Sequence, residues 1–254
     1  MVMLKHDETR APLVGGWLGT RSPAVVDACR EAGLEFVVLD TQHSALTLGG
    51  CAELLAGVEA DDFSVLVRVD SNDHAQIGKA LDFGASAVIV PLVETAEQAA
   101  AAASACRFPP LGTRSYGPVR RDISSASPTE LDERASLFVM IETTLGLQNA
   151  AEIAATPGVD GIFVGPADLS ISLGLAPHRA FDTDQLEEHF RALRRLADEN
   201  GLMLGTLGLD ADSTRKWLDY GCDLVAVVTA ERRLLGDAVT RLAGDIRVRG
   251  SVEG

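Results

Sequence analysis

GVDGIFVGPADLSISLG, residues 158–174, is the stretch that decides the fold. Its apolar run Gly161 to Val164 breaks at Gly165 and Pro166, and the carboxylate of Asp168 and a short helical pattern follow. Continuous apolar runs are typical of strands buried in a parallel sheet, and in a (β/α)8 barrel the residues just past such strands carry the chemistry. Asp168 is therefore a candidate active-site residue, although an Asp here could also simply cap the next helix.

The same arrangement recurs at three other places in the chain. The apolar runs 35–39, 64–67 and 137–141 end at Asp40, Arg68 and Glu142 respectively. If the strands close into a barrel, all these charges converge on one mouth. With His43 three residues after Asp40, they predict a metal and oxyanion site rather than scattered helix caps.

Strand and helix patterns alternate along the whole chain. Strands are expected at 13–19, 35–40, 63–69, 86–90, 137–141, 161–164, 202–205 and 223–228. Helices are expected at about 22–32, 44–59, 74–84, 94–106, 143–155, around 169, and at 183–200, 212–220 and 231–247. Strict alternation favours a parallel (β/α)8 barrel formed by residues 1–254 as one domain. A doubly wound sheet is the alternative, but its G-x-G-x-x-G fingerprint is absent.

Length and composition narrow the class of protein. The chain has 254 residues, close to the roughly 250 of a single (β/α)8 domain. Its formal charge of -15 disfavours nucleic acid and anionic membranes as partners. The four cysteines form no C-x-x-C pair, which indicates a reducing compartment. With no signal-like or membrane-spanning apolar run, we expect a soluble cytoplasmic protein.

The segment 107–127 has little periodicity and many turn residues. A loop of this length in a compact domain is usually a lid, a binding loop or a subunit contact.

Glu142 and Asp168 follow neighbouring strands of the expected barrel, whose ends lie about 5 Å apart. Two carboxylates at that separation repel unless a cation lies between them, and Mg²⁺ is commonly held by one or two carboxylates plus waters and ligand oxygens. No Cys or His stands beside them in the sequence, which disfavours a dedicated zinc site.

Arg68 and His43 complete the candidate chemistry. The forked guanidinium of Arg68 suits a carboxylate or an oxyanion beside the metal, although it could instead form a salt bridge with Asp40 or Glu142. An imidazole oriented by Asp40 would make His43 a base near neutral pH, and the alternative is an ordinary loop histidine.

A Schiff-base mechanism is disfavoured, because none of the lysines Lys5, Lys79 and Lys216 ends a strand. What remains is metal-assisted chemistry on a 2-oxo acid, in which the metal and Arg68 stabilise an enolate.

Six segments together resemble the metal-dependent class II pyruvate aldolases of the HpcH/HpaI family. The family includes 4-hydroxy-2-oxoheptanedioate aldolase and 2-dehydro-3-deoxyglucarate aldolase, and the match spans roughly residues 13–230. The segments are LDTQHS (39–44), LVRVDSND (66–73), VIVPLVET (88–95), RFPPLGTRSYG (107–117), MIET (140–143) and GVDGIFVGPADLS (158–170).

The resemblance implies a (β/α)8 barrel, usually a homo-hexamer built as a trimer of dimers, with the last helix exchanged between subunits. It also implies a divalent metal ion, Mg²⁺ or Mn²⁺ with Co²⁺ as a further possibility. The residue roles that it implies are these: Glu142 and Asp168 as metal ligands, Arg68 on the pyruvate oxygen, His43 with Asp40 as the catalytic dyad, Gly165 and the backbone amides of Ala167 and Asp168 at the pyruvate carboxylate, Leu207 at the aldehyde pocket, and Asp82 near the neighbouring subunit's site.

The chain departs from the common family pattern at Thr41, Gln42, Asp70-Ser71, Ser115 and Met140. These departures spare the metal ligands and the base but alter the walls of the site.

The expected activity is aldehyde-lyase chemistry: reversible aldol cleavage of a 4-hydroxy-2-oxo acid to pyruvate, or a pyruvate analogue, and an aldehyde. One alternative is a CoA-ester lyase of the citrate-lyase β-subunit type, for which Arg114, Arg120 and Arg121 would have to bind the CoA phosphates. The other is a catalytically silent barrel that binds a 2-oxo acid.

Overall fold

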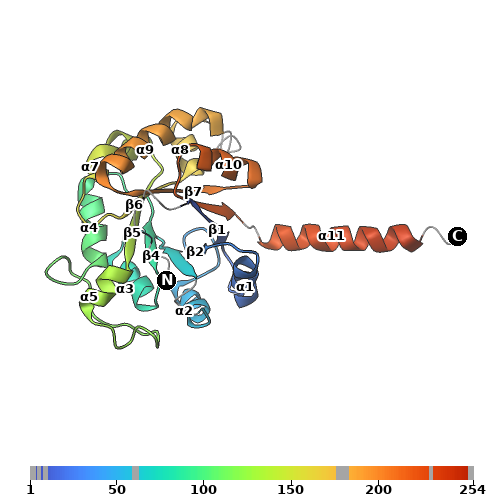
Figure 1. The fold of residues 1–254 in the computed structure, drawn as a ribbon, viewed down its shortest axis with the longest axis horizontal. Helices are drawn as coiled ribbons and strands as arrows, with labels where there is room; N and C mark the ends of the chain where they lie inside the picture. Colours follow the sequence, from blue (N-terminus) through green and yellow to red (C-terminus); the bar gives the residue numbers. More distant parts are fainter. Residues whose placement is uncertain are drawn as a thin grey trace.

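Eight parallel strands close into a barrel in the computed structural model, each hydrogen-bonded to the next and β8 to β1 (Figure 1). The structure describes residues 4, 7, 11–58, 63–175, 183–228 and 231–250. The expected barrel is confirmed, with every strand within a few residues of its predicted position. The strands are β1 (Leu13–Leu18), β2 (Phe36–Asp40), β3 (Ser64–Arg68), β4 (Ala87–Val90), β5 (Ser136–Ile141), β6 (Gly161–Val164), β7 (Met203–Gly208) and β8 (Leu224–Val228).

Helices follow the strands and surround the barrel (Figure 1). They are α1 (Pro23–Glu31), α2 (Leu48–Ala56), α3 (His74–Asp82), α4 (Ala96–Cys106), α5 (Pro128–Arg134), α6 (Thr144–Gln148), α7 (Ala150–Ala154), α8 (Pro166–Ser172), the 3-10 turn η2 (Thr183–Gln185), α9 (Glu187–Asn200), α10 (Ala211–Asp219) and α11 (Glu231–Gly250). The predicted end of the second helix, residue 59, lies outside the described residues.

Three details differ from the sequence expectation. The helix expected at 183–200 is the 3-10 turn η2 followed by α9, which begins at Glu187. The sequence pattern does not predict helix α5, yet Ser127 and Glu130 form a capping box at its start, which is a local signal in the sequence. The single helix expected at 143–155 is two short helices, because Asn149 leaves the helical conformation with φ -97° and ψ 8°. Its side chain donates instead to the carbonyl of Glu94 at 2.7 Å.

Phenylalanines fill the barrel interior opposite glycines on neighbouring strands. Gly15 pairs in register with Phe36, Gly161 with Phe138, and Gly205 with Phe163. A Cβ on Gly161 would lie 2.3 Å from the Phe138 ring. Because large and small residues alternate across the strands, the interior packs solidly and is no open channel.

The end of the barrel where strands begin is braced by a repeated contact. A side chain just before each even-numbered strand accepts the backbone N–H near the start of the preceding strand. The pairs are Glu35 with Val14, Ser86 with Val65, Asp160 with Leu137 and Asp223 with Leu204. Two of these carboxylates are neutralised, Asp160 by Arg107 and Asp223 by Arg194. This end of the barrel therefore contributes to stability, and the active site is expected at the opposite end, where the strands finish.

Helix α11 extends away from the barrel (Figure 1). Leu235, Val239, Leu242 and Ile246 are 57 to 67% exposed and recur at helical spacing, so they share one face. No helix in the described part of the chain combines the length and the hydropathy that a membrane span requires.

Candidate active site

A cavity of about 280 Å³ opens where the strands end. Seven of the eight strands or their following loops contribute side chains, which is why residues so distant in sequence meet there. Of the predicted site residues, all but Asp82 line it. The lining residues are Trp17, Gly19, Asp40, His43, Ser44, Arg68, Glu142, Gly165, Pro166, Ala167, Asp168, Leu207 and Val228.

Asp40 and Arg68 form a two-point ion pair at the ends of β2 and β3. Arg68 Nε donates to Oδ1 at 2.9 Å and Nη2 to Oδ2 at 2.7 Å. Burial raises the pKa of Asp40, but the hydrogen bonds and charge of Arg68 outweigh it and hold that pKa below its ordinary value. The salt bridge considered as an alternative role for Arg68 is thus present. Within the described ranges, the sole hydrogen bond of Nη1 is a 4.0 Å contact with Met140 Sδ, so Nη1 remains available to a ligand oxygen.

Trp17, near the end of β1, contacts both members of this pair. Its Nε1 donates to Asp40 Oδ2 at 3.2 Å, and the Arg68 guanidinium lies 4.8 Å from its ring centroid. The ring also packs on Phe163 at 5.5 Å. Sequence reasoning missed Trp17, although a tryptophan near the end of a glycine-rich strand was the available signal.

His43 lies on the loop after β2 and is exposed at the mouth. Asp40 Oδ1 accepts the backbone N–H groups of Gln42 at 3.0 Å and of His43 at 3.3 Å. Among the described residues no hydrogen bond joins the Asp40 carboxylate to the His43 imidazole. Asp40 therefore shapes the loop that carries His43 through the main chain, not through the expected contact with the ring.

Glu142 is 3% exposed and follows β5 directly. Burial is the main cause that raises its pKa to about 7, and the charge of Asp168 adds to it. The Leu92 N–H, 2.9 Å from Oε1, and the charge of Arg68 oppose this rise. A buried carboxyl beside a second carboxylate is a group that a cation would favour in its ionised form.

Gly165 makes room for the Glu142 carboxylate. A Cβ at this position would lie 2.5 Å from Glu142 Oε2. Helix α8 begins at the next residue and has Asp168 in its first turn. Backbone N–H groups in a first turn have no acceptor within the helix, so those of Ala167 and Asp168 are suited to an anionic ligand.

The donor set fits a hard divalent cation better than zinc. Glu142 and Asp168 offer carboxylate oxygens, and the described residues contain no group of three or more His, Cys, Asp or Glu side chains arranged to hold a metal. A magnesium-like ion needs only one or two carboxylates and takes its other ligands from water and substrate. No lysine lines the cavity in the part that the structure describes; Lys5 lies outside it.

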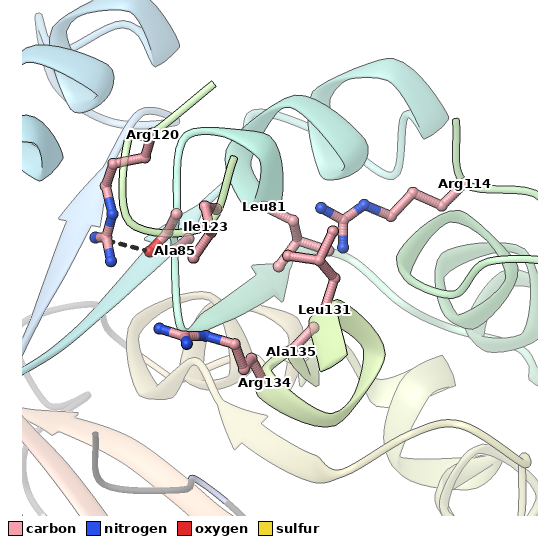
Figure 2. Close-up of a pocket in the computed structure, with 9 residues that line it drawn as sticks. Leu81, Ala85, Arg114, Arg120, Ile123, Leu131, Arg134 and Ala135 are labelled. Carbon is pink, nitrogen blue, oxygen red and sulfur yellow. Dashed lines mark hydrogen bonds between the residues drawn. The ribbon is translucent and has the colours of Figure 1, made fainter. Parts of the chain in front are cut away.

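Asp82 ends α3, near the other end of the barrel, where it pairs with Arg114 at 2.9 Å. Arg114 borders a small cavity of about 20 Å³ together with Arg120 and Arg134 (Figure 2). Arg120 pairs with Asp122 and donates to the Gly84 carbonyl, the contact dashed in Figure 2. This cavity has room for little more than a water molecule, so it is no metabolite site. Asp82 does not reach the catalytic cavity of its own chain.

The sequence matches a known protein family and aldolases of other organisms over most of its length. Residues 13–232 match the family described as HpcH/HpaI aldolase/citrate lyase. A hydroxypyruvate/pyruvate aldolase of Deinococcus radiodurans is 35% identical, over 95% of this chain and 88% of its own. A 4-hydroxy-2-oxovalerate aldolase of Novosphingobium aromaticivorans is also 35% identical, over 84% of this chain and 82% of its own.

Solved structures point the same way. The HpcH/HpaI aldolase of Desulfitobacterium hafniense superposes with a TM-score of 0.81 at 25% identity, over 91% of this chain and 93% of its own. A HpcH/HpaI aldolase/citrate lyase family protein of Burkholderia cenocepacia has a TM-score of 0.79 at 28% identity, over 93% and 95%. The chain therefore belongs to the HpcH/HpaI aldolase/citrate lyase family and is an enzyme of the aldolase type.

Proposed function

We propose that the protein catalyses the reversible aldol cleavage of a 4-hydroxy-2-oxo acid to pyruvate, or a pyruvate analogue, and an aldehyde. The observation that carries the proposal is the convergence of Glu142, Asp168 and Arg68 on one cavity. Glu142 and Asp168 would hold a divalent cation, Mg²⁺ or Mn²⁺ with Co²⁺ as a further candidate. When bound, that ion supplies Lewis-acid stabilisation of the negative charge that develops on the 2-oxo group.

The chain's own residues orient the acid. Arg68 Nη1, which Asp40 leaves unused, donates to the oxygen that becomes the enolate oxygen. The N–H groups of Ala167 and Asp168, beside Gly165, receive the carboxylate of the substrate. Because Trp17 and Asp40 hold the guanidinium rigidly, no reorganisation is needed when charge develops.

His43 transfers the proton. In the cleavage direction the C4 hydroxyl loses its proton toward His43, the C3–C4 bond breaks, and its electron pair passes into the enolate. The aldehyde leaves, and C3 takes up a proton to give the methyl group of pyruvate. The same steps in reverse order give aldol addition. The Asp40 part of the dyad acts by fixing the His43 loop and Arg68.

The aldehyde end of the cavity is apolar. Leu207 on β7 and Val228 on β8 are partly buried there and pack on the barrel core together with Trp17. These walls support a small aldehyde as the second product, with Leu207 as the principal contact.

The CoA-ester lyase is less well supported. Arg114 and Arg120 are paired with Asp82 and Asp122, and both border the small cavity by α3 and α5, not the catalytic one. Among the described residues that line the catalytic cavity, Arg68 alone has a permanent positive charge. Two of the three arginines that would have to bind the CoA phosphates, Arg114 and Arg120, thus lie outside the catalytic cavity.

The proposal includes an assembly of several copies. Helix α11 presents four exposed apolar residues and extends from its own barrel, so a second copy is the expected partner for this face. Exchange of α11 between subunits of a homo-hexamer, arranged as a trimer of dimers, would cover it and bring Asp82 near a neighbouring site. A cytoplasmic location accords with four buried free thiols.

Hydrogen–deuterium exchange at the methyl group of pyruvate tests the proposal, because it isolates enolate formation from the unknown aldehyde. We expect exchange with Mg²⁺ or Mn²⁺, none after EDTA treatment, and recovery on adding metal back. Glu142→Ala should abolish exchange, whereas Glu152→Ala, on the outer helix α7, should not. Undiminished exchange in EDTA would exclude the metal-dependent mechanism.

A further inference from the structure

Leu92, on the loop between β4 and α4, has an unusual backbone. Its φ of +54° makes it the one non-glycine residue with positive φ in the part of the chain that the structure describes. Leucine strongly disfavours this left-handed region, which glycine and asparagine tolerate. Its side chain is 52% exposed, so burial of the side chain does not explain the conformation.

A hydrogen bond of the Leu92 backbone amide explains the positive φ better. The Leu92 N–H donates to Glu142 Oε1 at 2.9 Å, across 50 residues of sequence. Strand β4 contributes no side chain to the described lining of the catalytic cavity. Its contribution is this donor, directed at a proposed metal ligand.

Contacts on the C-terminal side of Leu92 hold the loop in place. Val93 N–H donates to the Met140 carbonyl at 3.2 Å. At the next residue, Thr143 Oγ1 donates to Glu94 Oε1 at 2.8 Å, and Asn149 Nδ2 donates to the Glu94 carbonyl at 2.7 Å. These bonds tie the loop to the segment that carries Glu142. A strained conformation persists only where its surroundings over-determine it, and such residues cluster at functional sites.

We propose that Leu92 is a positioning residue whose left-handed backbone fixes the Glu142 carboxylate for metal binding. The inference rests on the proposed function. The amide occupies Oε1, while Oε2 lies against Gly165, where a Cβ would fall 2.5 Å away. One oxygen is thus anchored to protein and the other is left for the cation. The role belongs to the amide and to φ at residue 92, not to the leucine side chain.

Substitutions at residue 92 distinguish a role of the backbone conformation from a role of the leucine side chain. Leu92→Gly and Leu92→Asn keep the N–H and tolerate positive φ but remove the apolar side chain. Leu92→Ile keeps the apolar bulk but disfavours positive φ through its branched Cβ. Leu92→Val has the same branched Cβ with less bulk. Leu145→Ile, at an exposed leucine of ordinary φ in α6, is the matched control.

The experiment measures Mn²⁺ affinity of the full chain by the paramagnetic resonance signal of free Mn²⁺, with circular dichroism to confirm folding. Leu92→Gly, Leu92→Asn and Leu145→Ile should bind within about twofold of wild type. Leu92→Ile should bind at least tenfold more weakly and Leu92→Val several-fold more weakly. If Leu92→Ile does not fold, the comparison of Leu92→Val with Leu92→Gly decides.

Two results would overturn the inference: equal Mn²⁺ affinity in all folded variants, or a loss in Leu92→Gly as large as in Leu92→Val. A wild-type protein that binds no Mn²⁺ would instead overturn the proposed function, so the two failures are distinguishable.

Discussion

Arg68 grips Asp40 with two of its three guanidinium nitrogens, at 2.9 and 2.7 Å, and leaves the third for a ligand. Both side chains are 7% exposed, so the pair is desolvated and geometrically fixed. This single contact holds the ends of β2 and β3 together and fixes the orientation of the Arg68 guanidinium in the active site.

Arg68→Lys should lower both stability and activity, because lysine cannot make the forked contact. Impairing a buried pair costs up to about 3 to 5 kcal/mol, which urea denaturation would detect. Methyl exchange on pyruvate should fall by at least about 100-fold. The control is Arg30→Lys in the exposed pair with Asp27, where we expect about 0.5 kcal/mol or less. Equal effects at both positions would contradict the assigned role.

Trp17→Phe tests the tryptophan that the sequence did not single out. The change keeps an aromatic ring but removes the N–H that Asp40 accepts. Loss of a hydrogen bond to a charged group should cost about 1.5 to 3 kcal/mol. Trp217→Phe is the matched control, since Trp217 Nε1 is buried and has no hydrogen-bond partner among the residues that the structure describes. The hydrogen-bond argument requires the larger loss of unfolding free energy at Trp17.

The stability of the metal-free protein should fall as pH rises from about 4.5 to about 7. The pKa of Glu142 is raised from 4.5 to about 7, so the folded protein binds this proton more tightly than the unfolded chain. The stabilisation is complete below the unfolded pKa and is lost as pH passes the folded one, roughly 3 kcal/mol in all. Urea denaturation in EDTA at several pH values measures it.

Glu142→Gln is the control for that pH profile, since it cannot titrate and should remove this part of the slope. The lowered pKa of Asp40 affects stability in a separate pH range, below 3.8, where stability falls as pH falls.

Because the Glu142 proton must leave before a metal binds, Mn²⁺ affinity should rise with pH up to about 7 and then level off. A Mn²⁺ affinity independent of pH between 5 and 7 would contradict this account.

Gly165→Ala should impair metal binding with little effect on the fold. The added Cβ would lie 2.5 Å from Glu142 Oε2 and displace that carboxylate. We expect Mn²⁺ affinity to fall by about 10- to 100-fold. Gly78→Ala in α3 is the control, because a Cβ there meets no described residue within 4 Å and should stabilise the protein by about 0.5 to 1 kcal/mol. An unaltered Mn²⁺ affinity in Gly165→Ala would show that the carboxylate has room to move.

Leu242→Asp should dissociate the proposed assembly. A charge on the apolar face of α11, where Leu242 is 62% exposed in the single chain, opposes burial against a second copy. Light scattering should report a smaller mass while circular dichroism stays unchanged. Arg241→Asp, at a neighbouring exposed position on α11, should leave the mass unchanged. A wild-type chain that is monomeric would contradict the proposed exchange.

The sequence alone determined that the chain folds as a barrel and which residues lie at the end of the barrel that carries the site. Apolar runs that each end in one charge, alternating with helical patterns, admit few arrangements, because parallel strands joined by helices place all their C-terminal ends at one edge. Asp40, His43, Arg68, Glu142 and Asp168 were therefore identifiable without coordinates.

Only the tertiary structure decided which groups are partners. That Arg68 pairs with Asp40, that Trp17 supports both, and that Asp82 pairs with Arg114 remote from the cavity depend on how side chains reach across the closed barrel. The Leu92 amide on Glu142 is likewise invisible in the sequence, since the two residues are 50 apart and no local pattern specifies φ at a leucine. Strand patterns encode which residues arrive at the mouth; closure and packing determine what each one contacts there.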